Sequence, residues 1–110
     1  MGKFVKGDVV AVPFPFTDLT GQKKRPAFVV VPLRGDDVIL CMITTRSKRD
    51  EYSIDLTSTH FVEGGLPEPS VIRPNRLFTA DTKIIDSKRG RATPSKSNEV
   101  IEKIIALLRE

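Results

Sequence analysis

Apolar residues come in short runs separated by turn residues, a pattern typical of a small β protein. A first run, 9–12, ends at the alternating prolines of 13–16, which cannot donate to a sheet ladder. The next two runs, 27–31 and 38–43, are almost continuously apolar and flank the turn residues 34–37. Uninterrupted runs are typical of strands covered on both faces, so these two are predicted to lie at the centre of a sheet.

Shorter segments follow in the second half of the chain. Residues 52–56 alternate between apolar and polar side chains, and residues 61–67 are rich in turn formers. Residues 70–79 predict a strand bent near Pro74, and residues 82–85 a last short strand. Strands this short and closely spaced predict a small, partly closed barrel.

The carboxyl end changes to a helical period. Its apolar residues recur at steps of three and four, which predicts an amphipathic helix with Ser95 or Ser97 as N-cap. These residues are Val100, Ile101, Ile104, Ile105 and Leu108. A length of 110 residues suits one domain, so residues 1–110 are expected to form a single, mostly β unit with one C-terminal helix.

Charge then narrows the class of partner. The net charge is +4 and the cations cluster along the sequence, which favours an anionic partner, most commonly nucleic acid. The alternative is that these clusters are solvated loop charges that aid solubility. The clusters are Lys23 to Arg25, Arg46 with Lys48 and Arg49, Arg73 with Arg76, and Lys88 to Arg91.

Several kinds of chemistry find no support in the sequence. Cys41 lies in an apolar run and is expected to be a buried, inert thiol, and a single cysteine cannot form an internal disulfide. His60 and Cys41 cannot make the usual zinc site, and neither nucleotide-binding glycine loop is present, so no metal or cofactor is predicted. Without a membrane-span pattern or signal peptide, the expected location is cytoplasmic and away from membranes. His60 itself is expected to have a surface or structural role.

One geometric inference concerns the hairpin that turns at 34–37. Counting outward from that turn pairs residue 25 with a partner near 45, so Arg25 and Thr44 are predicted to lie at the same end of neighbouring strands. A guanidinium binds phosphate oxygens through two parallel hydrogen bonds, and a neighbouring hydroxyl adds another. This pair is therefore a candidate phosphodiester site, although binding without catalysis would have the same pattern.

Four segments together resemble the MazF/PemK family of toxin endoribonucleases of type II toxin–antitoxin systems. The resemblance covers about residues 5 to 91, with the final helix also expected. The matching segments are Lys6-Gly7-Asp8-Val9-Val10 with the later Pro13 to Asp18, the Arg25-Pro26-Ala27 motif at 24–30, the run 39–45 that ends in Ile43-Thr44, and Arg73-Pro74-Asn75-Arg76-Leu77-Phe78-Thr79 within 70–79.

The resemblance implies an SH3-like barrel of the CcdB/PemK plug type that forms a homodimer. It also implies an mRNA interferase that inhibits growth by cutting single-stranded RNA without a metal, leaving 2′,3′-cyclic phosphate and 5′-hydroxyl ends. The family's catalytic arginine and threonine correspond to Arg25 and Thr44. A cognate antitoxin with an acidic, apolar tail is the implied partner, and contact with DNA is expected only through it.

The remaining cations and hydroxyls near these motifs are the candidate RNA-binding residues. They are Lys23, Lys24, Thr45, Arg46, Ser47, Lys48, Arg49, Arg73 and Arg76. Base specificity is expected in the loops 17–24 and 46–52, because single-stranded RNA is recognised by stacking and edge contacts. Arginine has too high a pKa to be an ordinary general base, so the base is left unassigned.

Two other functions remain open from the sequence. One is a non-catalytic nucleic-acid-binding barrel, which would bind RNA in a salt-dependent way without cutting it. The other is a CcdB-like poison of DNA gyrase, which shares the barrel architecture. That reading is disfavoured because such proteins usually depend on carboxyl-terminal residues that are often aromatic, and this chain ends in Leu107-Leu108-Arg109-Glu110.

Overall fold

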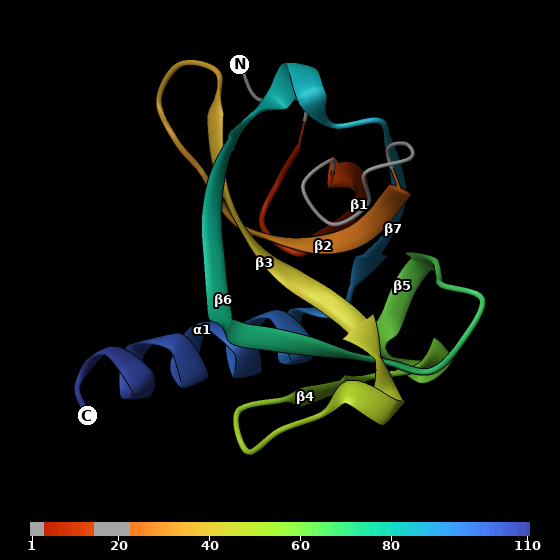
Figure 1. Cartoon of the computed structure of the whole chain (residues 1–110), viewed down its shortest axis with the longest axis vertical. Coiled ribbons are helices and arrows are strands. Elements are labelled where there is room, and N and C mark those ends of the chain that lie inside the picture. Colours follow the sequence, from red (N-terminus) through yellow and green to blue (C-terminus); the bar gives the residue numbers. More distant parts are fainter. Residues whose placement is uncertain (1–3, 15–22) are drawn as a thin grey trace.

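A computed structural model describes residues 4–14 and 23–110 of the chain (Figure 1). Within these residues seven strands form one antiparallel sheet in the order β4-β6-β3-β2-β1-β7-β5. The strands are β1 (Asp8–Phe14), β2 (Lys23–Pro32), β3 (Asp37–Thr45), β4 (Ile54–Leu56), β5 (Phe61–Gly64), β6 (Ser70–Asp81) and β7 (Ser87–Ala92), and they are followed by the helix α1 (Pro94–Leu108). The predicted mostly β fold with a C-terminal helix is confirmed.

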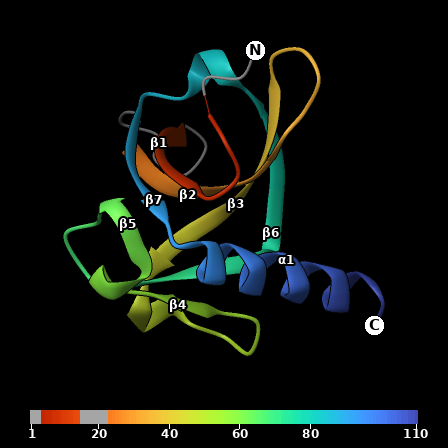
Figure 2. The ribbon, with the colours of Figure 1, turned by 180° about the vertical axis from the view of Figure 1, so that it is seen from behind.

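The two apolar runs occupy the middle of the sheet, as their lack of alternation predicts. Strands β2 and β3 lie between β1 and β6, and both strands contribute to one core cluster on one face of the sheet and to a second cluster on the other face. One cluster includes Phe28 and Cys41 together with Val100 from α1. The other includes Val29 and Leu40 and is closed by the curl of the sheet. Figure 2 shows α1 lying across the first of these faces.

The predicted helix cap is wrong. The N-cap is Thr93, whose hydroxyl accepts a hydrogen bond from the Lys96 backbone N–H at 3.1 Å. Pro94 occupies the first helical position, where its missing N–H costs nothing, so the helix begins before both predicted serines. Ser97 is instead buried within the first turns of the helix.

Three further local predictions differ from the structure. Residues 82–85 do not form a strand, because Asp81 accepts a hydrogen bond from the Lys83 backbone N–H at 2.8 Å and caps a 3₁₀ turn at Thr82–Ile84. Strands β5 and β7 were missed in the turn-rich and basic segments. Their residues lack an apolar alternation, and each strand forms through pairing with a distant part of the chain.

Strand β6 is continuous but strongly bent (Figure 1). In the ladder between β3 and β6, Cys41 pairs with Leu77, but the next residue of β3, Met42, pairs with Arg73. The intervening residues 74–76 form a bulge, which bends a strand and increases its local twist. The bend predicted near Pro74 is therefore present, and it lets β6 follow the curved sheet.

The expected state of Cys41 is confirmed. The thiol is fully buried, and burial raises its pKa to about 12, so the nucleophilic thiolate is strongly disfavoured. Within residues 4–14 and 23–110, no helix is long and apolar enough to span a membrane.

Gly64 is a position where the fold requires glycine. Its φ is +65°, and an added Cβ would clash with the Arg89 carbonyl oxygen. Gly35 also has a positive φ, +79°, but an added Cβ there meets nothing within 4 Å. Gly64→Ala is therefore expected to lower the free energy of unfolding by about 2–4 kcal/mol, against about 1 kcal/mol for Gly35→Ala.

Urea unfolding of the two variants measures this difference. Both carry the same left-handed backbone penalty, so the excess cost at Gly64 reports the steric contact with β7. Equal destabilisation of the two variants would show that the close approach of Gly64 to Arg89 does not constrain the fold.

Candidate functional site

Strands β2 and β3 separate at one end of the sheet. Their ladder runs from Pro32 down to the pair Ala27 and Met42, and no pairing between the two strands continues beyond it. Beyond this last pair, β2 remains paired with β1, where Arg25 is opposite Val12, whereas β3 remains paired with β6. The ladder stops next to Pro26, which has no N–H to donate. A split between two central strands is the result.

Arg25 and Thr44 flank this split. Each lies two residues beyond the last pair of the ladder, so continuing the register would place them opposite one another. The sequence count gave a partner near 45. The difference of one residue comes from the irregularity between Val29 and Val31, where β2 holds one more residue than β3.

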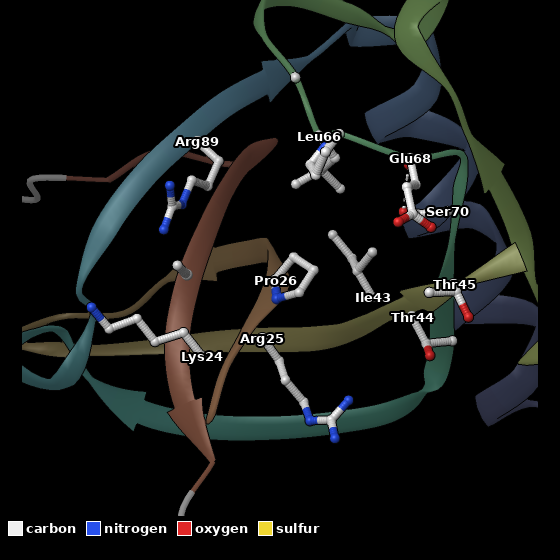
Figure 3. Close-up of a pocket in the computed structure, with 13 residues that line it drawn as sticks. Lys24, Arg25, Pro26, Ile43, Thr44, Thr45, Leu66, Glu68, Ser70 and Arg89 are labelled. Atoms are coloured by element: carbon white, nitrogen blue, oxygen red, sulfur yellow. Dashed lines mark hydrogen bonds between the residues drawn. The ribbon is translucent and has the colours of Figure 1, made fainter. Parts of the chain in front are cut away.

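A cavity of about 440 Å³ opens at the split (Figure 3). Arg89 and Lys24 lie on one side, Glu68, Ser70 and Thr45 lie on the other, and apolar side chains form the surface between them. The described lining residues are Ala11, Lys24, Arg25, Pro26, Ile43, Thr44, Thr45, Gly65, Leu66, Pro67, Glu68, Ser70 and Arg89. The lining thus combines cations, an apolar floor and a carboxylate.

Arg25 and Thr44 share one face of the sheet, and their neighbours Pro26 and Ile43 point to the other. Successive strand residues alternate between faces, and opposite residues share a face. Figure 3 shows the Arg25 and Thr44 side chains directed away from Leu66 and Glu68, whereas Ile43 points towards Leu66. The predicted pair therefore lies on the rim of the cavity, with the main chamber on the opposite side of the strands.

Arg25 keeps its hydrogen-bonding capacity. It is half-buried, and its guanidinium has no ion pair or hydrogen bond to any residue within 4–14 or 23–110. Its Nε is buried and also lacks a partner within those ranges. A partly desolvated guanidinium in this state binds an anion strongly, because few competing water or protein contacts must be given up.

Arg73 lies on the same face but is already paired. It is opposite Met42 in the β3–β6 ladder and therefore diagonal to Thr44. Its Nη2 donates to Asp50 Oδ2 at 2.6 Å, and this bond, with a second from the Tyr52 backbone N–H, lowers the pKa of Asp50 to about 2. Arg73 thus fixes the segment after β3, and the charge of Asp50 offsets most of its own positive charge beside Thr44.

Three of the other predicted cations also have carboxylate partners. Lys24 pairs with Asp86 at 3.0 Å, while Arg46 and Arg49 pair with Asp55 at 3.6 and 2.7 Å. These contacts are solvent-exposed, so they order the loops more than they stabilise the fold. The loop also holds a hydrogen bond of 3.0 Å between the Thr45 and Ser47 hydroxyls.

Of the nine predicted RNA-binding residues, Lys24 and Thr45 are the two among the described residues that line the cavity. Lys48 and Arg76 are exposed, without a charged partner in the described part of the chain, and neither lines the cavity. Lys23 is the first residue of β2, but its side chain lies outside the described structure, as does the predicted specificity segment 17–22.

Arg89, Glu68 and Ser70 were missed by the sequence reasoning. Strand β7 has an irregular register where Val9 pairs with Gly90 and Val10 pairs with Lys88, which leaves Arg89 as the extra residue of a bulge. A bulge changes the direction of a side chain, and this one places Arg89 in the cavity lining. The basic run at 88–91 was the available signal, but a bulge cannot be located from one sequence.

The segment 65–70 forms the cavity wall opposite the Arg89 side chain, and hydrogen bonds hold it at both ends. The Gly65 backbone N–H donates to the Arg89 carbonyl at 3.1 Å, and the Ser70 hydroxyl donates to the Glu68 carbonyl at 3.0 Å. Proline on either side of Glu68 restricts the backbone between these two anchors. Glu68 is consequently presented by an ordered segment.

His60 is accounted for by local structure. Its Nδ1 accepts a hydrogen bond from the Thr57 backbone N–H at 3.0 Å in a short capped turn, Ser58–His60. His60 does not line the cavity. Within the described ranges, no three His, Cys, Asp or Glu residues are grouped so that they could hold a metal ion.

Comparison with known families gives one match that covers nearly the whole chain. Residues 5–108 match the model described as PemK-like, MazF-like toxin of type II toxin–antitoxin system. No curated protein sequence matches the chain.

Solved structures support the same fold at low sequence identity. An endoribonuclease in complex with its cognate antitoxin, from a mycobacterial species, is 16% identical with a TM-score of 0.73, covering 96% of this chain and 95% of that one. MazF from Deinococcus radiodurans is 22% identical with a TM-score of 0.70, covering 97% of each chain. A MazE–MazF structure from the same organism is 20% identical with a TM-score of 0.72, covering 96% of this chain and 94% of that one.

The Asp50–Arg73 pair predicts a specific dependence of stability on pH. The pKa of Asp50 is lowered in the folded state, so its stabilising effect is complete above about pH 4 and is lost as pH falls towards about 2. Asp50→Asn is expected to lower the free energy of unfolding at neutral pH and to flatten its decrease in acid.

Urea unfolding at a series of pH values from neutral to about 3 tests this expectation. Glu102→Gln is the matched control, since Glu102 is an exposed helix carboxylate without a described partner. An Asp50→Asn variant that followed the wild-type pH curve would rule out a stabilising contribution from the pair.

Proposed function

The chain belongs to the family of PemK-like, MazF-like toxins of type II toxin–antitoxin systems, and we propose that it is an endoribonuclease that cuts single-stranded RNA at specific sites without a metal ion. The observation that carries this proposal is the placement of Arg25, unpaired among the described residues, beside Thr44 at the split between β2 and β3.

In the proposed reaction the RNA 2′-hydroxyl attacks the adjacent phosphorus. A new bond forms between the 2′-oxygen and phosphorus, and the bond to the 5′-oxygen of the next nucleotide breaks. The proton of the 2′-hydroxyl leaves to a base, and the departing 5′-oxygen takes up a proton. The products are a 2′,3′-cyclic phosphate and a 5′-hydroxyl, with no water consumed.

Arg25 supplies the charge that this reaction requires. Negative charge accumulates on the equatorial oxygens of the phosphorane, and a guanidinium held in place stabilises that charge more than the charge of the ground state. The Thr44 hydroxyl donates to a phosphate oxygen or orients the 2′-hydroxyl. Because a fixed cation already performs the electrostatic role, we propose that no divalent metal is needed.

A single-stranded substrate suits the dimensions of the site. The reactive pair lies on the rim of a cavity of about 440 Å³, with an apolar floor of Pro26, Ile43 and Leu66. Bases in a duplex are stacked and paired, whereas those of a single strand turn outwards and enter protein pockets. A nucleotide next to the scissile phosphate is thus able to occupy the cavity.

The proposed protein partner is a cognate antitoxin. Arg25 and Arg89 keep positive charge beside an apolar surface, which fits a segment of acidic and apolar residues. One mycobacterial endoribonuclease of the same fold was solved with its cognate antitoxin. A homodimeric toxin in the cytoplasm, in contact with DNA only through the antitoxin, is part of the same proposal.

Substitution of the reactive pair tests the function. Arg25→Ala is expected to lower the rate of RNA cleavage by roughly 100- to 1,000-fold, the typical loss when one stabilising donor is removed from a developing anion. Thr44→Val is expected to reduce the rate as well, and Thr44→Ser to retain most of it because the hydroxyl is kept. Wild-type cleavage should be unchanged in EDTA.

Arg34→Ala is the matched control because Arg34 is an exposed arginine in the hairpin turn, away from the cavity. Unfolding curves show whether each variant keeps the fold. Cleavage by a folded Arg25→Ala protein at the wild-type rate would remove Arg25 from the mechanism. Salt-dependent binding of RNA by the wild type without any product would favour a non-catalytic barrel instead.

A further inference from the structure

The cavity beside the reactive pair has the chemical zones of a nucleotide-binding site. Figure 3 shows Arg89 on one side of it and Glu68 on the other, with Pro26 and Ile43 between them. Cations match a phosphate, and apolar side chains match the face of a base. A carboxylate is an unusual addition, because it opposes a polyanion unless it makes a specific contact.

Glu68 is the one acidic residue among the described residues that line the cavity. Its side chain is exposed and has no hydrogen bond or ion pair with a described residue. By contrast, Asp50, Asp55 and Asp86 are all paired with cations. The Glu68 carboxylate is therefore uncommitted, while its backbone is fixed between two prolines and by the bond from Ser70.

A role for Glu68 as the general base does not fit the arrangement of the strands. The general base must reach the 2′-hydroxyl beside the phosphate that Arg25 and Thr44 hold. Those two side chains point away from Glu68, on the opposite face of the strands (Figure 3). Glu68 faces the chamber over Pro26 and Ile43, where a nucleobase of the RNA would lie and the reacting phosphate would not.

We propose that Glu68 recognises guanine in the nucleotide next to the cut, an inference that rests on the proposed cleavage of RNA. An ionised carboxylate accepts hydrogen bonds and donates none. Guanine alone presents two adjacent donors on its pairing edge, N1–H and N2–H₂, which match the two carboxylate oxygens. Adenine and cytosine each offer one amino group beside an acceptor, and uracil offers one imide N–H between two carbonyls.

The arrangement also separates recognition from chemistry. The guanine ring packs on Pro26, Ile43 and Leu66, and its pairing edge meets Glu68, while Arg89 lies where the sugar and phosphate of that nucleotide continue. The neighbouring phosphate passes over the strands to Arg25 and Thr44. Base preference then resides in the wall 65–70, in addition to the loops expected from the sequence.

Single-stranded DNA gives a test that does not depend on cleavage, because it lacks the 2′-hydroxyl. Thymidine-rich probes that carry one guanine, hypoxanthine, adenine or cytosine are titrated with the protein by fluorescence anisotropy. We expect the guanine probe to bind roughly 5- to 150-fold more tightly than the adenine probe, as for a two-bond base contact. Hypoxanthine keeps N1–H but lacks the amino group, so its probe should fall between them.

Glu68→Gln changes the preference in a defined direction. The amide offers one acceptor and one donor, so it cannot accept from both guanine donors. It can form two hydrogen bonds with the amino group and N1 of adenine and two with N1–H and O6 of guanine, so the guanine-to-adenine ratio should fall towards one. Loss of the negative charge favours binding of every probe alike, so the guanine-to-adenine ratio, and not the absolute affinity, is the measurement. Glu102→Gln carries the same charge change on α1, away from the cavity, and should keep the guanine preference.

Mapping of RNA cleavage sites with the same three proteins separates the two proposals. Guanine should be enriched beside the cleaved bond for the wild type and Glu102→Gln, and this enrichment should be lost for Glu68→Gln. If the DNA preference behaves as expected but no RNA is cut, the nuclease proposal fails and the guanine site stands. Binding without guanine preference, or a preference unchanged in Glu68→Gln, overturns the guanine site whether or not RNA is cut.

Discussion

The end of the hydrogen-bond ladder between β2 and β3 is the constraint on which the site depends. Pairing stops at Ala27 and Met42, next to a proline that has no N–H to donate. Beyond that point each strand stays with its outer neighbour, so the middle of the sheet opens without the loss of either core cluster. Arg25 and Thr44 gain a shared opening that a continuous ladder would have closed.

Charge at this opening is governed by which cations remain unpaired, and the net charge of +4 is a poor guide to it. Lys24 and Arg73 both have carboxylate partners at 3.0 Å or less, which order the rim and reduce its field. Arg25 and Arg89 form no ion pair within 4 Å in the described part of the chain, although Arg89 is close enough to help lower the pKa of Asp86, which pairs with Lys24. The positive potential is consequently concentrated at two positions, one on each side of the strands, and not spread over the basic clusters of the sequence.

Local patterns predicted the centre of the fold well, since the apolar runs of β2 and β3 determine both their burial and their pairing. Counting across one hairpin brought Arg25 to within one residue of its register with Thr44, and the error came from a bulge. Features that depend on distant partners could not be predicted in the same way. Strand β7 forms only between β1 and β5, and Arg89 enters the cavity only because β7 bulges against β1. Likewise, Arg73 resembled a free RNA-binding cation until Asp50 was seen to bind it.

The wall that carries Glu68 is structurally separate from the strands that carry Arg25 and Thr44. It follows Gly64, whose backbone packs against the Arg89 carbonyl, and ends where Ser70 pairs with Thr45 at the start of β6. Residues 67–69 within it are exposed and belong to neither core cluster, whereas Leu66 packs against the first cluster and Ser70 is buried, so substitution at 67–69 has little effect on packing. A reactive pair at the opened ladder and a replaceable wall on its far side would let base preference change while the cleavage chemistry stays fixed. This division follows from the alternation of side chains along two strands, because neighbours in sequence face opposite sides of the sheet.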